Sequence, residues 1–262
     1  MIDANFRPRI AFEHCSRFTI LQILTLFMDK TPHGWMIVDA ETPILTYEYS
    51  FGPGTANALA VGCDGGLIVI SPPCKAPAGV FEDLGRFGAV RALVAPNAFH
   101  NMGIAEWKRR FVNTGIFAPA QSIARVERQS GLRGVDPVAK AQMICGPRLA
   151  LVDMPHYKTG EILVRIETAR GLYWYVTDVI LNMLELPSHP VARLLFKLTA
   201  SAPGLRWNNI APLFMVKNKA ALRRWLAAEA EKNPPRWLIP AHGNIVDVQT
   251  NQEAVRQLFA VH

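Results

Sequence analysis

The residues best suited to metal chemistry stand where four short apolar runs end. The run within Arg91–Gly103, RALVAPNAFHNMG, closes in His100 and Asn101. Three later runs, LALVDMPH, LYWYVTD and RWLIPAH, close in His156, Asp178 and His242. Imidazole and carboxylate groups are ligands for Zn²⁺ and Fe²⁺. The recurrence predicts one shared metal site, because any single instance is weak.

Each run has the length and composition of a buried β-strand. A strand covered on both faces reads as a continuous apolar run, and residues past its end lie at the sheet rim, where α/β folds assemble sites. Each residue also has a structural interpretation, since a lone histidine commonly forms hydrogen bonds or caps a helix. For His242 that interpretation is weaker, because Gly243 permits a tight turn.

The chain has 262 residues, half of them hydrophobic, so it can bury a sizeable core. Because no repeat, low-complexity segment or long charge run divides the sequence, we predict a single domain over residues 1–262. The net charge of +7 favours acidic partners. Its basic residues are scattered and not interleaved with aromatic ones, so the composition does not favour a nucleic-acid partner.

The cysteine spacing and one apolar stretch indicate the cellular compartment. No CxxC spacing occurs, which predicts reduced thiols in a cytoplasmic protein, and the four cysteines are Cys15, Cys63, Cys74 and Cys145. The stretch Phe18–Met28 has no small-residue cleavage site and is shorter than the roughly 20 residues of a bilayer span. We therefore predict a core helix there and no membrane partner.

Hydrophobic periodicity predicts the elements between these sites. Strands are expected at 35–39, 44–49, 55–61, 66–71, 149–153, 162–166, 172–176 and 236–239. Helices are expected around 80–87 and 104–111, and residues 112–134 read loosely as a strand followed by a loop. A helical insertion at about 180–235 carries two apolar stripes, at 191–198 and 222–230. It either shapes a substrate pocket or covers a sheet face.

In their order along the chain, the strand-end residues resemble the metallo-β-lactamase superfamily. The segment DMPHYKTGE, which contains His156, resembles the GHTxG region of that superfamily. The segment WYVTD resembles the strand that leads to its bridging acid, at Asp178, and IPAHG resembles its last motif, at His242. The resemblance covers roughly residues 55–262. It implies an α/β fold, a four-layer αββα sandwich of two mixed β-sheets with outer helices.

The first motif of that superfamily, HxHxDH, is altered in this chain. Aligned on Gly103, Pro96 and Ala98 replace the first two histidines, and neither can bind a metal. A shift of one or two residues would bring Asn97 into play. The resemblance implies at most one tightly bound divalent ion, zinc or iron, with a ligand set drawn from His100, Asn101, His156, Asp178 and His242.

The resemblance implies a metal-dependent hydrolase of a small ester, lactone or thioester, in which the metal acidifies water and polarises the scissile bond. Asp178 and His156 would be its catalytic residues, with His156 as a fourth ligand or a base. The missing histidines motivate an alternative, a catalytically impaired protein of the same fold that serves in binding or interaction. A nuclease comes last, because nucleases of the superfamily rely on the intact two-metal motif.

Overall fold

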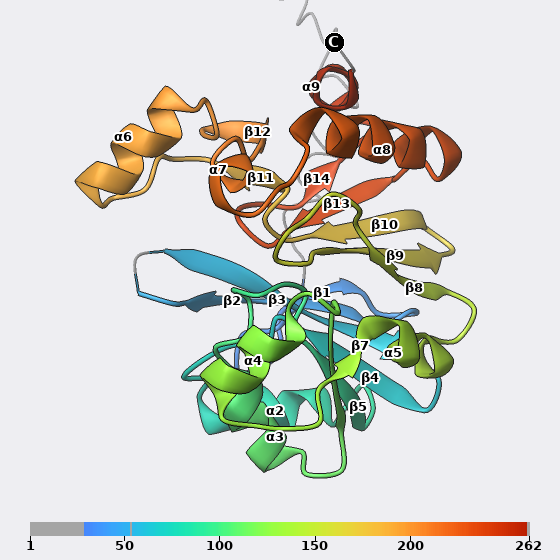
Figure 1. Cartoon of the computed structure of the whole chain (residues 1–262). Coiled ribbons are helices and arrows are strands. Elements are labelled where there is room, and N and C mark those ends of the chain that lie inside the picture. Colours follow the sequence, from blue (N-terminus) through green and yellow to red (C-terminus); the bar gives the residue numbers. More distant parts are fainter. Residues whose placement is uncertain (1–28, 53, 261–262) are drawn as a thin grey trace, which may run out of the picture.

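The described residues, 29–52 and 54–260, form two β-sheets that pack face to face, with helices on both outer faces (Figure 1). The structure is a computed structural model. Its layers confirm the αββα architecture that the resemblance implied. The predicted helix at Phe18–Met28 lies outside the described residues, and none of the helices in those residues is long and apolar enough to cross a bilayer.

The larger sheet has seven strands arranged in chain order. The first four pair antiparallel, and the next three continue the sheet in parallel. These strands are β1 (Met36–Asp39), β2 (Ile44–Ser50), β3 (Thr55–Cys63), β4 (Gly66–Ile70), β5 (Val90–Val94), β6 (Gly115–Ala118) and β7 (Asp136–Pro137). The predicted β3–β4 hairpin is confirmed, and Gly65 supplies the positive φ angle, 75°, that its tight turn requires.

The smaller sheet has five strands, in the order β14, β13, β10, β9, β8. These are β8 (Leu149–Asp153), β9 (Ile162–Thr168), β10 (Gly171–Val176), β13 (Trp237–Pro240) and β14 (Val246–Asp247). Strands β9 and β10 form the predicted hairpin, while β10 and β13 run parallel, with Val176 opposite Pro240. The residues that follow β10 and β13 therefore emerge at the same edge.

Apolar side chains from both sheets meet in the inner core. Leu59 and Ile68 of the larger sheet and Val164 and Tyr175 of the smaller one are fully buried in it. Helix α5 (Val138–Cys145) packs against the same core. Because helices cover the outer faces as well, the central strands are apolar on both sides, which explains their continuous apolar runs.

The outer helices pack on two further apolar clusters. Helices α2 (Ala78–Leu84), α3 (Ile104–Arg110) and α4 (Ile123–Ser130) contribute to the cluster around Trp107 on the larger sheet. Helices α8 (Lys219–Lys232) and α9 (Gln252–Phe259) cover Trp174 on the smaller sheet. The prediction of a loop was wrong at α4. Only Val126 of this short helix is buried, so its apolar face rests on Ile123 and Val126, three residues apart.

The segment predicted as a helical insertion also contains strands. Strands β11 (Ile180–Met183) and β12 (Gly204–Trp207) form a separate two-stranded sheet, and the shorter helices of this segment are α6 (Pro190–Leu198) and α7 (Ala211–Phe214). The two predicted apolar stripes differ in burial. Helix α8 buries Leu222 and Leu226 against the smaller sheet, whereas α6 buries none of its residues.

A buried carboxylate ties the segment before β1 to helix α2. Asp83 is 5 % exposed and accepts hydrogen bonds from the Thr31 hydroxyl and from the His33 backbone N–H at 2.8 Å. The His33 imidazole Nδ1 lies 2.9 Å from its other oxygen. Burial alone would raise the pKa of Asp83, but these hydrogen bonds lower it more, so the pKa lies below its ordinary value.

Replacing Asp83 with Asn removes the charge that these donors face. We expect Asp83→Asn to lower the free energy of unfolding by about 1–3 kcal/mol at neutral pH. Because the folded-state pKa is lowered, the contribution of Asp83 is present above the ordinary Asp pKa and is lost as the pH falls through the folded-state pKa. Urea unfolding at several pH values measures both effects. The half-exposed Asp136→Asn is the control, with a change of at most about 0.5 kcal/mol, and equal losses in the two variants would contradict the assignment.

Candidate metal centre

Asp178 and His242 reach the same edge of the smaller sheet because their strands are parallel neighbours. Each stands two residues past the end of its strand, β10 for Asp178 and β13 for His242. The carboxyl ends of parallel strands are where α/β folds build sites. Gly243 has a φ of 106°, and a Cβ atom there would lie 1.9 Å from the Asn182 carbonyl oxygen, so the turn after His242 requires glycine.

His100 comes from the other sheet, in the loop between β5 and α3. Asn97 shapes this loop, because its side-chain oxygen accepts hydrogen bonds from the backbone N–H groups of Phe99 at 2.8 Å and His100 at 2.9 Å. An isolated β-bridge between Asn97 and Glu161 joins the loop to the smaller sheet. The third candidate ligand is thus held in place by contacts across the sandwich.

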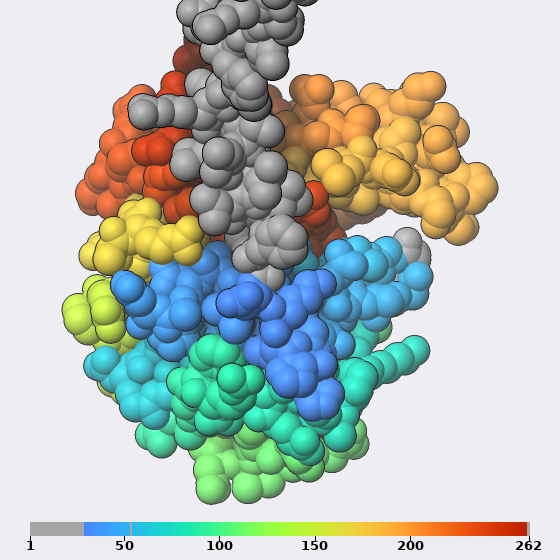
Figure 2. Space-filling model, turned by 180° about the vertical axis from the view of Figure 1, so that it is seen from behind, coloured from blue at the N-terminus to red at the C-terminus, as the bar shows by residue number. Residues whose placement is uncertain are grey.

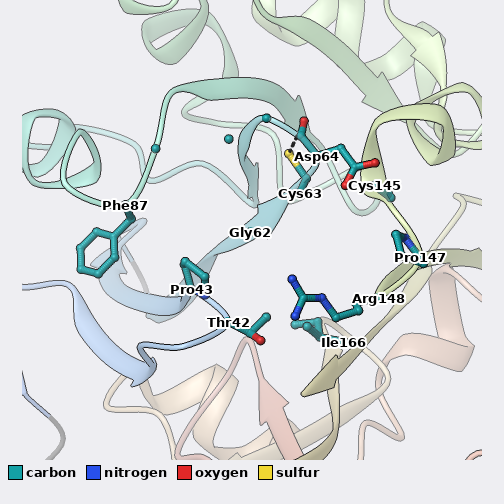
Figure 3. Close-up of a pocket in the computed structure, with 13 residues that line it drawn as sticks. Thr42, Pro43, Gly62, Cys63, Asp64, Phe87, Cys145, Pro147, Arg148 and Ile166 are labelled. Carbon is teal, nitrogen blue, oxygen red and sulfur yellow. Dashed lines mark hydrogen bonds between the residues drawn. The ribbon is translucent and has the colours of Figure 1, made fainter. Parts of the chain in front are cut away.

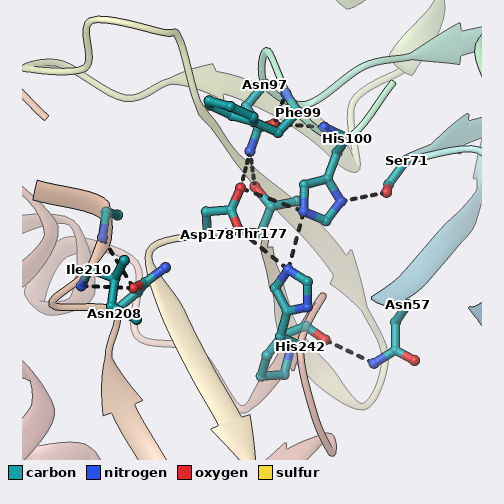
Figure 4. Close-up of polar contacts among 12 residues, drawn as sticks. Asn57, Ser71, Asn97, Phe99, His100, Thr177, Asp178, Asn208, Ile210 and His242 are labelled. Carbon is teal, nitrogen blue, oxygen red and sulfur yellow. Dashed lines mark hydrogen bonds and ion pairs between the residues drawn. The ribbon is translucent and has the colours of Figure 1, made fainter. Parts of the chain in front are cut away.

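His100, Asp178 and His242 converge on one point (Figure 4). The distance from His100 Nε2 to Asp178 Oδ2 is 3.5 Å, and that from His242 Nε2 to Asp178 Oδ1 is 3.3 Å. The two Nε2 atoms are 3.3 Å apart, and one ligand atom from each residue lies within 4.8 Å of the others. Two imidazoles and a carboxylate form a donor set that zinc and iron both accept.

The outer nitrogen of each imidazole has its own partner. His242 Nδ1 lies 2.8 Å from the Thr55 carbonyl oxygen, which only accepts, so Nδ1 carries a proton and the neutral ring turns the Nε2 lone pair inward. His100 Nδ1 lies 2.8 Å from the Ser71 hydroxyl, which lies 2.9 Å from the Tyr49 hydroxyl. Hydrogen bonds of this kind orient the imidazole ligands of metals.

A second carboxylate, Glu161, is fully buried next to Asp178. The Asn97 side-chain N–H donates to Glu161 Oε2 at 2.9 Å and to Asp178 Oδ2 at 2.7 Å, and the Thr177 hydroxyl donates to Glu161 as well. Burial, followed by the negative charge of Asp178, raises the pKa of Glu161 to about 8. The two carboxyl groups therefore differ, because their surroundings favour the protonated form of Glu161 and the charged form of Asp178.

Asp178 keeps its charge because the imidazoles face it. Burial raises the pKa of Asp178, but His100 and His242 lower it more, and it lies well below its usual range. Burial likewise lowers the pKa of His242, whereas the hydrogen bond and charge of Asp178 raise it, with a raised pKa as the net result. The centre therefore favours a positive charge facing Asp178, which either a proton or a metal ion can supply.

The structure brings together three of the five residues predicted as metal ligands. His156 is exposed, has a backbone φ of 66°, and lies outside the converging group. Asn101 is buried, but its side-chain N–H donates at 2.8 Å both to the Ala98 carbonyl and to the Gln129 side chain. This geometry supports neither residue as a ligand, nor His156 as a base.

Sequence reasoning missed most of the groups that surround the ligands. It raised Asn97 only through an alternative alignment, and it did not identify Glu161 or Ser71. Glu161 carried one usable signal, a carboxylate directly before the apolar run of β9. Ser71 carried none, because a serine between a strand and two prolines is ordinary turn composition.

A separate cavity of about 530 Å³ opens at the other end of the sandwich, lined in part by Cys63, Cys145 and Arg148 (Figure 3). Cys63 and Thr55 are the two ends of β3, about 25 Å apart at the rise of an extended strand. Burial raises the pKa of Cys63 to about 11 and that of Cys145 to about 12. Both thiols are therefore protonated and unreactive at neutral pH, so the converging ligands are the stronger candidate site.

Solved structures of similar architecture are metallo-β-lactamase folds. A metallo-β-lactamase from Erythrobacter litoralis aligns with a TM-score of 0.58 and 15 % identity over 89 % of this chain and 99 % of its own. The metallo-β-lactamase FIM-1 from Pseudomonas aeruginosa, in its mono-zinc form, aligns with a TM-score of 0.53 and 15 % identity over 88 % of this chain and 96 % of its own. A flavo di-iron protein from Thermotoga maritima aligns with a TM-score of 0.56 and 13 % identity over 84 % of this chain and 60 % of its own. This chain has the metallo-β-lactamase fold.

No protein-family model matches the chain, and no curated protein is significantly similar to it. At identities of 15 % or less, the three structures show the fold alone. They confirm the architecture that the order of strand-end residues implied. The case for a metal centre rests on the chain's own side chains.

Replacing Glu161 with Gln tests the buried carboxyl pair. A raised folded-state pKa means that Glu161 favours folding below the ordinary Glu pKa, and that this contribution is lost as the pH rises through about 8. As the pH rises from about 5 to about 9, we expect the free energy of unfolding of the metal-free protein to fall less in Glu161→Gln than in the wild type. Urea titrations across that range measure it, and parallel profiles would show that Glu161 is not held protonated.

Proposed function

We propose that this chain is a metal-dependent hydrolase that binds one divalent ion, zinc or iron, through His100, Asp178 and His242. The observation that carries the proposal is the convergence of two imidazole nitrogens and one carboxylate within 4.8 Å at the strand ends. Among solved structures of similar fold, one is described as mono-zinc and another as a di-iron protein, which supports both metals as candidates.

The donor set fits a cation. With its Nδ1–H directed to Thr55, a neutral His242 turns a lone pair toward His100 Nε2 and Asp178 Oδ1, both 3.3 Å away. If His100 donates its own Nδ1–H to Ser71, three lone pairs face one another. A divalent ion satisfies all three at once, whereas one proton satisfies only one pair of them.

A bound ion would supply Lewis acidity, which lowers the pKa of water and polarises a carbonyl oxygen. The chain's own residues determine where this acts. Thr55 and Ser71 hold the imidazoles with Nε2 directed inward, and Asn97 engages Asp178 Oδ2. Asp178 Oδ1, beside His242 Nε2, is then the carboxylate oxygen that would hold the ion.

The proposed substrate is a small ester, lactone or thioester. This class follows from the resemblance of the strand-end motifs to the superfamily. A nuclease has less support, because Pro96 and Ala98 stand where two-metal members of the superfamily carry histidines. The catalytically impaired alternative, a binding protein of the same fold, is decided by metal content.

Substituting His242 tests the metal centre. We expect wild-type protein reconstituted with Zn²⁺ or Fe²⁺ to hold at most one ion per chain, and His242→Ala to retain none, because it loses an inward-facing imidazole nitrogen. Elemental analysis after desalting measures the ion, and circular dichroism checks that the fold remains.

The matched control is His156→Ala, which removes an exposed imidazole outside the converging group. We expect it to retain the ion. Loss of the ion from His156→Ala would restore His156 as a ligand, and two ions per chain would show that the first motif holds a second metal. Wild-type protein that takes up no ion overturns the proposal and favours the binding protein.

Asn97 positions Asp178 and should tune the metal affinity. We expect Asn97→Ala to weaken metal binding by about 10–100-fold, because Asp178 and Glu161 lose their shared hydrogen-bond donor. Competition with a chromophoric chelator measures the affinity. Asn101→Ala is the control, since Asn101 is a buried asparagine of the same loop that faces Gln129, and it should change the affinity by less than about threefold. Equal effects would mean that loop stability, and not the contact with Asp178, sets the affinity.

A further inference from the structure

Helix α6 presents an apolar surface that nothing in the described chain covers. Its nine residues include none that is buried, although they carry a leucine-rich stripe of helical spacing. Val191, Leu194 and Leu198 are between 57 % and 74 % exposed, and Leu184, just before the helix, is 71 % exposed. An amphipathic helix ordinarily buries such a stripe, and exposed clusters of this kind mark interaction surfaces.

The helix also stands apart from the body of the molecule (Figure 2, orange). A nine-residue helix is too short to be stable in water on its propensity alone, since isolated helices are marginal below about 12–15 residues. Such helices normally gain their stability from packing the apolar face. The exposed face of α6 is therefore suited to a partner that covers it.

Charge identifies the kind of partner. Glu185 stands beside Leu184, but from Leu186 to Ala228 the sequence contains no Asp or Glu, and its cations are Arg193, Lys197, Arg206, Lys217, Lys219, Arg223 and Arg224. Two of them, Arg193 and Lys197, are exposed on α6 itself, beside the apolar stripe. A helix with exposed leucines and cations, and with no acidic residue of its own, has the composition of helices that lie in the surface of anionic membranes.

We infer that α6 docks this protein on an anionic lipid surface, with Val191, Leu194 and Leu198 inserted among the lipids and Arg193 and Lys197 at the headgroups. A second copy of the chain fits this face less well, because it would bring the same cations against each other. The inference replaces the expectation that the chain has no membrane partner. That expectation concerned a bilayer-spanning segment, whereas a helix that lies in the interface needs no such length.

Vesicle co-sedimentation of the full chain tests the inference. We expect the protein to pellet with phosphatidylcholine vesicles that contain phosphatidylserine, to stay in solution with pure phosphatidylcholine, and to be released as salt screens the cations. The double variant Leu194→Glu with Leu198→Glu should weaken binding at least about a hundredfold. Arg193→Gln and Lys197→Gln should each weaken it about fivefold.

The matched control is Val112→Glu with Met143→Glu, which makes the same change in charge at two exposed apolar side chains outside the insertion. It should bind within about threefold of the wild type. Wild-type protein that does not pellet with anionic vesicles, or a control that loses as much as the α6 variant, overturns the inference. Light scattering that shows a dimer in the wild type and a monomer in the α6 variant, without vesicle binding, would assign the face to a second copy.

Discussion

The site depends on one partly buried charge, the carboxylate of Asp178. It is 14 % exposed, and an ionised carboxylate in such a place is stable only where donors or cations compensate for the lost water. Asn97 supplies a hydrogen bond to one oxygen, and two imidazoles face the carboxylate from opposite sheets. Burial and the charge of Asp178 raise the pKa of Glu161, which disfavours a second negative charge beside Asp178. The neighbourhood thus concentrates negative charge on one group, which is what a site for a single cation requires.

The groups that compensate the charge of Asp178 also connect the two sheets. His242 follows a strand of the smaller sheet, yet its imidazole is oriented by Thr55 at the start of β3 in the larger one. Asn57, two residues on, donates to the Pro240 and Gly243 carbonyls at 3.1 Å and 2.8 Å, and Tyr175 donates to the Asn57 carbonyl at 2.8 Å. The start of β3 therefore holds the turn that carries His242, so the geometry of the candidate ligands and the packing of the sandwich are stabilised by the same hydrogen bonds.

These contacts explain which features the sequence could predict. Buried strands keep their apolar runs wherever they pair, so β8, β10 and β13 and the positions of Asp178 and His242 past their ends were readable from local pattern. Burial and side-chain direction depend on tertiary contacts, so the sequence could not show that His156 turns to solvent or that Asn101 turns to Gln129. The role of Asn97 depends on Glu161, 64 residues away, and a single sequence contains no sign of that pairing.

The same edge of the molecule also carries the insertion. Strand β11 begins two residues after Asp178, and the Asn182 N–H donates to the His242 carbonyl at 2.9 Å. The Asn244 N–H donates to the Asn182 carbonyl at 3.0 Å, and Asn182 bridges to Gly243. The base of the insertion is thus fixed to the turn that holds His242, while α6 extends away from it. A surface that takes up α6 would therefore lie at a defined orientation to the candidate metal centre, because β11 is anchored beside Asp178 and His242.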